Sequence, residues 1–343
     1  MKNKLLFLLL AILMMKNDFA QTINIQPGKA KNTFVVTADN KPFTEFIFPD
    51  SLEKPVLYPI YAADGEIITR GFPLAPRQNE SVDHPHHIGL WMNYESVNGL
   101  DFWNNSSAIP ADKKSKYGWI KTKAVSDIKT GNTGSLTYTA DWQSIDHKTL
   151  MEEKTTLAFS AKGNIRIIDR VTTLTAKEPV SMPDIKDGFL GLRVTHELEM
   201  PSKEDREFTD ANGIITKVKA ADDKLVSGNY LTSKGYQGDA AWATRGEWCM
   251  LYGKKGNDSI SIAIIDHPKN VGYPTYWHAR GYGLFAANPL GQKIFSNGKE
   301  TLNFSLKENK AVTFRYRIVI YSGATVLPVA EIEKLKKAFE SIP

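Results

Sequence analysis

Hydrophobic and polar residues alternate along much of this chain, and this pattern predicts β-strands. The clearest alternation runs through 164–171, where it indicates one face in solvent and one face against a buried layer. Lys162-Gly163-Asn164, which overlaps its start, is typical of a hairpin turn. The predicted strands are 33–37, 43–48, 55–61, 135–142, 154–161, 164–176, 189–198, 248–252, 259–266, 283–287, 301–306 and 312–321.

One segment, 328–342, has the pattern of an amphipathic helix. Val329, Ile332, Leu335, Ala338 and Phe339 recur at helical spacing, and Glu and Lys occupy the opposite face. Because the predicted strands are joined by loops rather than by helices, we expect antiparallel sheets packed face to face. The predicted fold class is an all-β, large antiparallel two-sheet β-sandwich, with the C-terminal helix on a sheet edge or on the outside.

The N-terminus has the features of a signal peptide. A basic start, 1–4, precedes an uninterrupted apolar run, 5–15, which is too short for a stable bilayer anchor. We expect cleavage after Ala20, and no cysteine follows the run to form a lipoprotein anchor. The sequence therefore predicts export to the periplasm or secretion, one β-sandwich domain over 21–343, and no membrane span in the mature protein.

Composition narrows the classes of function. The formal net charge is +5, from 43 basic and 38 acidic residues that are interleaved without a basic block, so we expect no nucleic-acid partner. Neither a Gly-x-Gly-x-x-Gly turn nor a phosphate loop occurs, so we expect no nucleotide cofactor. Cys249 is the only cysteine, which excludes an intramolecular disulfide, and its apolar surroundings predict a buried, inert thiol.

A histidine-rich run is the strongest candidate for chemistry. His84, His86 and His87 fall within four positions, with Asp83 before them and Trp91, Asp101 and Trp103 after them. Histidine moves protons and binds metals near neutral pH. On an extended strand, His84 and His86 would share a face and present two imidazoles to one divalent metal ion, with His278, His196, Asp83 or Asp101 completing the set. The alternative is a rigid loop held by histidine hydrogen bonds.

Two further segments carry candidate site residues. The first, 273–283, contains Trp277, His278, Arg280 and Tyr282 between glycines, and Arg280 is suited to a two-pronged bond with a carboxylate or vicinal hydroxyls. The alternative is an aromatic corner with a structural ion pair. The second segment, 186–197, places Asp187 before a predicted strand that carries Arg193. A structural turn aspartate is an equal alternative to a catalytic one.

Taken in order, these motifs resemble the DUF6807 family. The resemblance rests on His84-Pro85-His86-His87 with Leu90-Trp91, on 97–103, and on Trp277-His278-Ala279-Arg280 with Tyr282-Gly283, and it covers about 30–325. The family is a domain of unknown function found mostly in bacteria. Its frequent label, "PmoA-like" or methane oxygenase, implies a membrane monooxygenase, yet the chain has no apolar stretch of about twenty residues that would span a bilayer. The resemblance instead implies sugar processing and a galactose-mutarotase-like super-sandwich.

These observations favour an exported carbohydrate-active enzyme of the hydrolase, lyase or epimerase type, acting on a sugar or oligosaccharide by acid–base chemistry. The catalytic candidates are His86, His87, His278, Arg280 and Asp187, and the substrate-binding candidates are Trp91, Asp101, Trp103, Arg193, Trp277 and Tyr282. Two alternatives stay open. One is a non-catalytic carbohydrate-binding protein, and the other is a metal-dependent oxidase that uses His84, His86 and His278.

Overall fold

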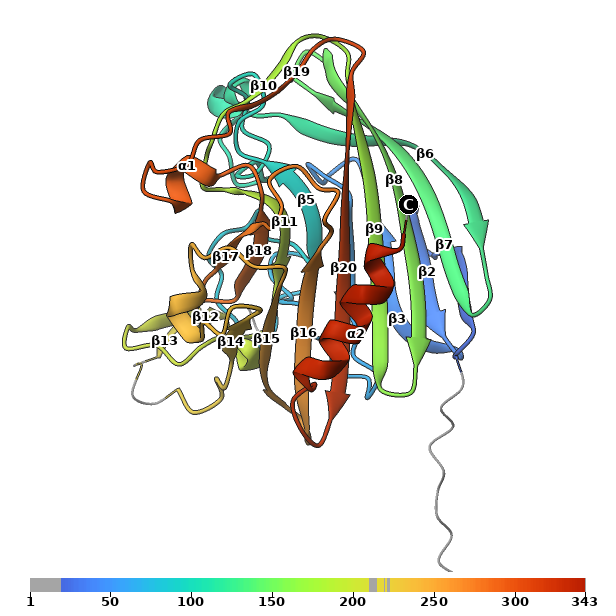
Figure 1. Cartoon of the computed structure of the whole chain (residues 1–343), viewed down its shortest axis with the longest axis vertical. Coiled ribbons are helices and arrows are strands. Elements are labelled where there is room, and N and C mark those ends of the chain that lie inside the picture. The colour runs from blue at the N-terminus through green and yellow to red at the C-terminus, as the bar shows by residue number, and fades with distance from the viewer. Residues whose placement is uncertain (1–19, 210–214, 219, 221–222, 343) are drawn as a thin grey trace, which may run out of the picture.

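Two eight-stranded antiparallel sheets form the molecule in the computed structural model, which describes residues 20–209, 215–218, 220 and 223–342 (Figure 1). The first sheet has the order β1 (Ile23–Pro27), β2 (Thr33–Ala38), β3 (Lys41–Ile47), β4 (Val56–Ile60), β5 (Leu90–Tyr94), β11 (Gly188–Arg193), β18 (Leu284–Asn288) and β17 (Tyr276–Ala279). The second has the order β14 (Asn229–Thr232), β15 (Trp248–Lys255), β16 (Asp258–Asp266), β20 (Ala311–Gly323), β9 (Ile165–Ala176), β8 (Thr149–Lys162), β7 (Thr133–Gln143) and β6 (Trp119–Lys129). Two short pairs complete the strands, β10 (Val180–Met182) with β19 (Phe304–Leu306) and β12 (Arg206–Thr209) with β13 (Ile215–Val218).

The second sheet follows the alternation in the sequence. Along β9, half-buried and buried residues alternate without a break, and Gly163 at a φ of 56° makes the turn from β8. Aromatic side chains join the two sheets, because the ring of Phe46 on β3 stacks on that of Tyr138 on β7 with 4.7 Å between centroids. The ring of Phe43 meets that of Phe159 edge-on at 5.7 Å. The predicted two-sheet antiparallel sandwich is confirmed.

Helix α2 (Val329–Glu340) covers the outer face of the second sheet (Figure 1). Ile332 and Phe339 are fully buried there against Trp248 and Val319, and the indole N–H of Trp248 donates to Glu333 at 2.6 Å. The predicted C-terminal helix therefore exists and lies outside the sandwich. The other α-helix among the described residues, α1 (Gln292–Phe295), is a single turn. No helix in the described part of the chain is long and apolar enough to cross a membrane.

The expected strands differ from the observed ones at several places, and two-sided burial accounts for only some of them. The strand predicted over 189–198 ends at Arg193, and His196–Leu198 is a 3₁₀ turn. Strand β5 was not predicted, since all five of its residues are buried and no alternation marks it.

Cys249 is buried, as predicted. The predicted signal peptide, 1–20, lies outside the described residues except for its last position.

Candidate functional site

The candidate site lies on the face of the first sheet that points away from the second sheet. Cross-strand partners there form one row through four strands, from Trp91 to Gly191 to Ala286 to His278. The two middle residues are the smallest side chains available, so the row leaves room above the backbone between Trp91 and His278. The three sequence segments singled out above each contribute a residue to this row or to the loops over it.

The space above Gly191 is filled by indole rings. A Cβ at this position would lie 2.6 Å from Trp91 and 2.9 Å from Trp103, so both rings rest directly on the glycine backbone. Trp91 and Trp103 are at most 1 % exposed, and Trp277, which is fully buried, belongs to the core between the sheets. The sequence analysis expects a sugar to stack on Trp91, Trp103 or Trp277, and in the structure all three rings are covered by other protein atoms.

The tryptophans instead support the histidines. The ring of His87 stacks on that of Trp91 at 5.3 Å, and the His84 ring stacks on His87 at 4.8 Å with only 3° between the planes. Tyr282 then stacks on His84 at 5.1 Å, with the planes 1° apart. The histidine run and the 273–283 segment are thus in direct contact, which joins two of the predicted constellations.

The histidine run is a loop and not a strand, so the expected alternation of its side chains is wrong. His84 has a φ of 44° and is exposed, whereas His86 and His87 are buried. Left-handed backbone is uncommon for a residue other than glycine and persists where the surroundings impose it. Here Arg70 imposes it, because its guanidinium donates to the backbone carbonyls of Asp83 at 2.8 Å and of His84 at 2.9 Å.

Two buried arginines hold the Asp83 carboxylate. Its Oδ1 lies 2.5 Å from the guanidinium of Arg70 and 2.8 Å from that of Arg193, and these arginines are 1 % and 0 % exposed. Its Oδ2 lies 2.8 Å from Nδ1 of His84. Burial alone would raise the pKa of Asp83, but the hydrogen bond with His84 and the charges of Arg193 and Arg70 outweigh it and hold that pKa far below its usual range.

An ionised Asp83 fixes the tautomer of His84. A carboxylate only accepts hydrogen bonds, so Nδ1 of His84 is the donor to Asp83, and Nε2 is the ring nitrogen that stays available to another partner. The side chain of His84 is 40 % exposed and its neighbour Tyr282 lines the adjoining cavity. His84 is therefore the histidine of the run that can exchange a proton with a bound molecule, a role that the sequence analysis gave to His86 and His87.

The other three histidines of the predicted site are held neutral. Burial, together with the charges of Lys54 and His84, lowers the pKa of His86 to about 2. Burial likewise sets the pKa of His87 well below its usual value and lowers that of His278 to about 3. Since none of them takes up a proton near neutral pH, they serve as neutral packing and hydrogen-bonding groups.

A carboxylate cluster lies beside this histidine layer. Oδ1 of Asp187 is 3.8 Å from Nδ1 of His278. This Nδ1 atom is buried and has no hydrogen-bond partner among the described residues. Burial raises the pKa of Asp187, and burial and the charge of Asp187 raise that of Glu95. Asp101, a predicted substrate-binding residue, instead accepts both hydrogen bonds that Asn104 donates at 2.9 Å, so it shapes a turn.

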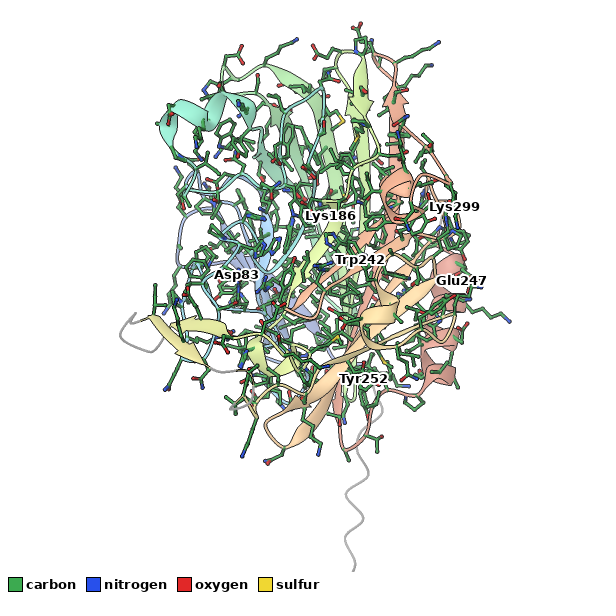
Figure 2. All side chains as sticks on the ribbon, turned by 90° about the vertical axis from the view of Figure 1, so that its left-hand side faces the viewer. Asp83, Lys186, Trp242, Glu247, Tyr252 and Lys299 are labelled. Atoms are coloured by element: carbon green, nitrogen blue, oxygen red, sulfur yellow. The ribbon has the colours of Figure 1, made fainter. Side chains whose placement is uncertain are left out.

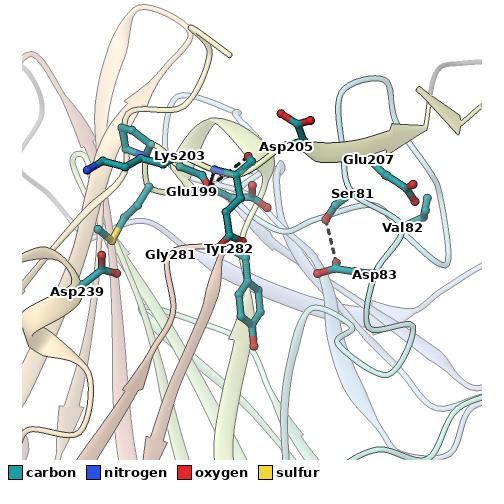
Figure 3. A pocket seen from close by; sticks show the side chains of 14 residues that line it. Ser81, Val82, Asp83, Glu199, Lys203, Asp205, Glu207, Asp239, Gly281 and Tyr282 are labelled. Atoms are coloured by element: carbon teal, nitrogen blue, oxygen red, sulfur yellow. Dashed lines mark hydrogen bonds between the residues drawn. The ribbon is translucent and has the colours of Figure 1, made fainter. Parts of the chain in front are cut away.

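The solvent side of the site is an open cleft. A cavity of about 760 Å³ is lined by residues 81–83, 199–205, Glu207, Asp239 and 281–282 (Figure 3). It adjoins a second cavity of about 270 Å³ along Asp239, Trp242 and 279–282. The guanidinium of Arg280 lies 4.7 Å from the Trp242 ring centre and 5.8 Å from that of Tyr282. Figure 2 shows Asp83, Lys186 and Trp242 across the middle of one view of the molecule.

Sequence reasoning missed three residues of this site. Trp242, which is only partly buried, lies between two alanines, and no sequence motif marks it. Arg70 precedes a glycine in a loop, and its role depends on distant carbonyls. Lys54 is buried, its Nζ donates to the carbonyl of His86 at 2.7 Å, and burial lowers its pKa to about 8. No local pattern predicts a buried lysine, because its partner is 32 positions away.

The suggested metal set is not assembled. Within the described residues, no group of three or more histidine, cysteine, aspartate or glutamate side chains is arranged to hold a metal ion. The rings of His84 and His86 are 5.6 Å apart and face each other edge-on, while His278 contacts Trp242 and Phe295. The three histidines therefore take up separate places in the site.

Comparison with known proteins identifies the family. A sequence model of a family of unknown function, DUF6807, matches residues 33–337 and confirms the resemblance seen in the motifs. Comparison with curated proteins gave no match.

Similar solved structures include a family GH36 α-galactosidase from Geobacillus stearothermophilus, at 11 % identity and a TM-score of 0.38, covering 88 % of this chain and 41 % of that one. The chain thus spans about two fifths of that protein. A galactose 1-epimerase from Lactobacillus acidophilus NCFM (8 % identity, TM-score 0.37) and a galactose mutarotase-like protein from Clostridium acetobutylicum (9 %, 0.38) are each aligned over 89 % of this chain and 99 % of their own.

Proposed function

We propose that this chain, which belongs to the DUF6807 family, is an enzyme that transfers protons to and from a sugar or oligosaccharide. The observation that carries the proposal is the Asp83–His84 pair. An ionised carboxylate, held by two buried arginines, orients an exposed imidazole at the edge of an open cleft. Such an orientation is what a general base requires.

The second proton-transfer group in the proposal is Asp187. Its side chain is 18 % exposed, and its raised pKa favours the protonated form that a general acid needs. In the first step, Nε2 of His84 takes a proton from the substrate. Asp187 gives a proton to the substrate oxygen whose bond to carbon breaks. In the epimerase reaction the ring opens, and the return of both protons closes it again. In the lyase reaction a C=C bond forms, His84 passes its proton to water, and Asp187 regains a proton from water.

Reactions of the epimerase or lyase type suit this pair better than two-carboxylate glycoside hydrolysis. Hydrolysis of that kind needs two carboxyl groups facing the scissile bond, and Asp83 is committed to Arg70 and Arg193. Arg280 is exposed beside Tyr282 and Trp242, where it is suited to hold hydroxyl or carboxylate oxygens of the sugar. The basic and apolar segment at 1–15 supports the further proposal that this chemistry takes place outside the cytoplasm.

The proposal is tested by turnover measurements on purified protein. Anomer exchange of reducing hexoses is followed by proton NMR, and elimination from uronate oligosaccharides is followed by the ultraviolet absorbance of the unsaturated product. We expect His84→Asn and Asp187→Asn each to reduce the active reaction by about 100-fold or more.

Asparagine is a suitable replacement because it tolerates the positive φ at His84. The matched control is His147→Asn, at an exposed histidine in a hairpin turn with a φ of 64°. Turnover that survives His84→Asn would overturn the mechanism. If the wild-type protein binds sugars but shows no turnover, the proposed enzyme activity is wrong and the protein is a carbohydrate-binding protein.

A further inference from the structure

A groove of about 450 Å³ lies next to the proposed site and has a different chemical character. One wall is the turn after β14, with Lys234 and Tyr236. A second wall is the segment after α1, with Ser296, Asn297, Lys299 and Glu300, and the floor holds Arg245, Tyr276 and Phe295. Figure 2 shows Lys299 of the second wall on the far side of Trp242 from Asp83 in that view.

The arginine in the floor of the groove is held by hydrogen bonds and an ion pair within the protein. Arg245 donates to the backbone carbonyls of Gly272 at 3.1 Å and Pro274 at 2.7 Å. Its Nε and Nη2 also donate to Oε2 of Glu300, at 3.0 and 2.5 Å. Its guanidinium also lies 4.5 Å from the Tyr276 ring centre. The pair of Arg245 and Glu300 therefore adds no net charge to the groove and holds its floor rigid.

The two lysines carry the net charge of the groove. Lys234 and Lys299 are exposed and line two different walls, and their ammonium groups make no hydrogen bond or ion pair with any other residue in the described part of the chain. Each is next to a glycine with a φ of 82°, Gly235 and Gly298, so each stands on a tight turn. Two unpaired ammonium groups in one groove favour an anionic ligand.

Aromatic and hydroxyl groups accompany these charges. Tyr236 is 49 % exposed in the wall with Lys234, and Thr244, Ser296 and Asn297 line the same groove. An open aromatic ring beside hydrogen-bonding groups suits a sugar ring, which has apolar C–H faces and a polar rim. The groove therefore offers the aromatic and hydrogen-bonding contacts of a sugar subsite, together with a positive charge that favours an anionic sugar.

Trp242 connects the groove to the proposed site. Its ring contacts that of Phe295 in the groove floor at 5.2 Å and that of His278 at 4.8 Å, and it also walls the smaller cavity beside Tyr282. The cavity at the Asp83 end is lined by several carboxylates, among them Glu199, Glu204 and Asp239. The groove with the two lysines therefore attracts a negatively charged sugar unit more strongly than the Asp83 end does.

We infer that the groove between Lys234 and Lys299 binds an anionic sugar unit of an oligosaccharide whose neighbouring units extend toward Trp242. The inference rests on the proposed function for the choice of a sugar ligand. The shared ligand chemistry is a carboxylate or sulfate group on a sugar ring, and Lys234 and Lys299 bind it by charge while Tyr236 contacts the ring.

The test is a binding measurement by titration calorimetry on the full mature chain. The probes are a uronate oligosaccharide, a sulfated oligosaccharide and a neutral hexose oligosaccharide of equal length. We expect Lys234→Gln/Lys299→Gln to weaken binding of an anionic probe by about tenfold or more, with no effect on the neutral probe. Binding should also weaken with added salt. Comparison of the uronate and sulfated probes decides which anionic group is preferred.

The matched control is Lys307→Gln/Lys310→Gln, which removes the same charge from two exposed lysines around the turn between β19 and β20. An equal loss of affinity in both double variants would assign the effect to overall charge and overturn the inference, as would the absence of anionic-probe binding. The two proposals fail separately. Anionic-probe binding by a wild-type protein that shows no turnover supports the groove and overturns the enzyme. Turnover that is lost in His84→Asn, without anionic-probe binding by the wild-type protein, supports the enzyme and overturns the groove.

Discussion

The Asp83 carboxylate accepts a hydrogen bond from Nδ1 of His84 at 2.8 Å, and the two residues are neighbours in the chain. Adjacent residues seldom face each other in this way, and here the positive φ of His84 turns its ring back over the carboxylate. Arg70 and Arg193 hold the other carboxylate oxygen. The pair thus depends on two buried arginines from other parts of the chain.

Asp83→Asn is expected to destabilise the protein, because it leaves two buried guanidinium groups without their shared counter-charge. Loss of one partner from a fully buried pair costs several kcal/mol. Since the Asp83 side chain is 36 % exposed, solvent screens part of the loss, and we expect about 2 kcal/mol. Urea denaturation measures the effect. Asp146→Asn, at an exposed turn carboxylate, is the control, and equal midpoints for the two variants would contradict the assignment.

Stability should depend on the titration of His196. Its ring lies between Glu199, at 3.1 Å, and Asp223, at 3.3 Å, and Glu199 in turn lies 3.7 Å from Arg193. Burial lowers the pKa of His196, but the hydrogen bond and charge of Glu199 and the charge of Asp223 outweigh it, so the net shift is upward. The folded state thus holds the proton more tightly than the unfolded state.

The sign of the pH effect follows from that upward shift. The stabilisation is fully present below the unfolded pKa of about 6.5 and is lost as pH rises through the higher folded value. We expect the difference in urea midpoint between wild type and His196→Gln to shrink from pH 5.5 to pH 8.5. A difference that grows over this range would show that His196 is held neutral.

Gly191→Ala should strain the support beneath the histidines. The added methyl would lie 2.6 Å from Trp91, so the indole has to move, and overpacking of this kind costs about 1–3 kcal/mol. Thermal unfolding measures the loss. Gly281→Ala provides the comparison, since the nearest atom to its Cβ would be at an ordinary 3.5 Å. Equal stability of the two variants would show that the tryptophans are loosely packed.

Trp91→Phe and Trp242→Phe should separate structural from binding roles. Trp91 is buried and its N–H donates to Asn93 at 3.1 Å, so its loss should lower stability by about 1–3 kcal/mol. Trp242 is partly exposed in the cleft, so its replacement should weaken oligosaccharide binding with a smaller effect on stability. Urea denaturation and titration calorimetry on both variants check the contrast, and a reversed pattern would restore Trp91 as a sugar platform.

Local sequence patterns predicted most of the architecture. Strand β9 and helix α2 were predicted because each has one wet and one buried face, and such a face imposes a period on the sequence. The family likewise followed from short motifs in order. Strand β5 has no such period, since its residues are buried on both sides, and only its neighbours in the sheet define it.

The site was predictable as a set of segments but not as a set of roles. Histidine, tryptophan and arginine were noticed for their chemistry, yet the same residue types serve as support or as reactive groups according to what covers them. His84 and His87 differ by three positions, and the tertiary structure exposes one and buries the other. Burial and the charge of distant groups set each pKa, and neither quantity is encoded locally. The sequence by itself determined the sandwich, the C-terminal helix and the candidate segments. The packing of loops from distant parts of the chain decided which of these segments meet and which imidazole faces solvent, because both depend on contacts such as those of Arg70 and Arg193.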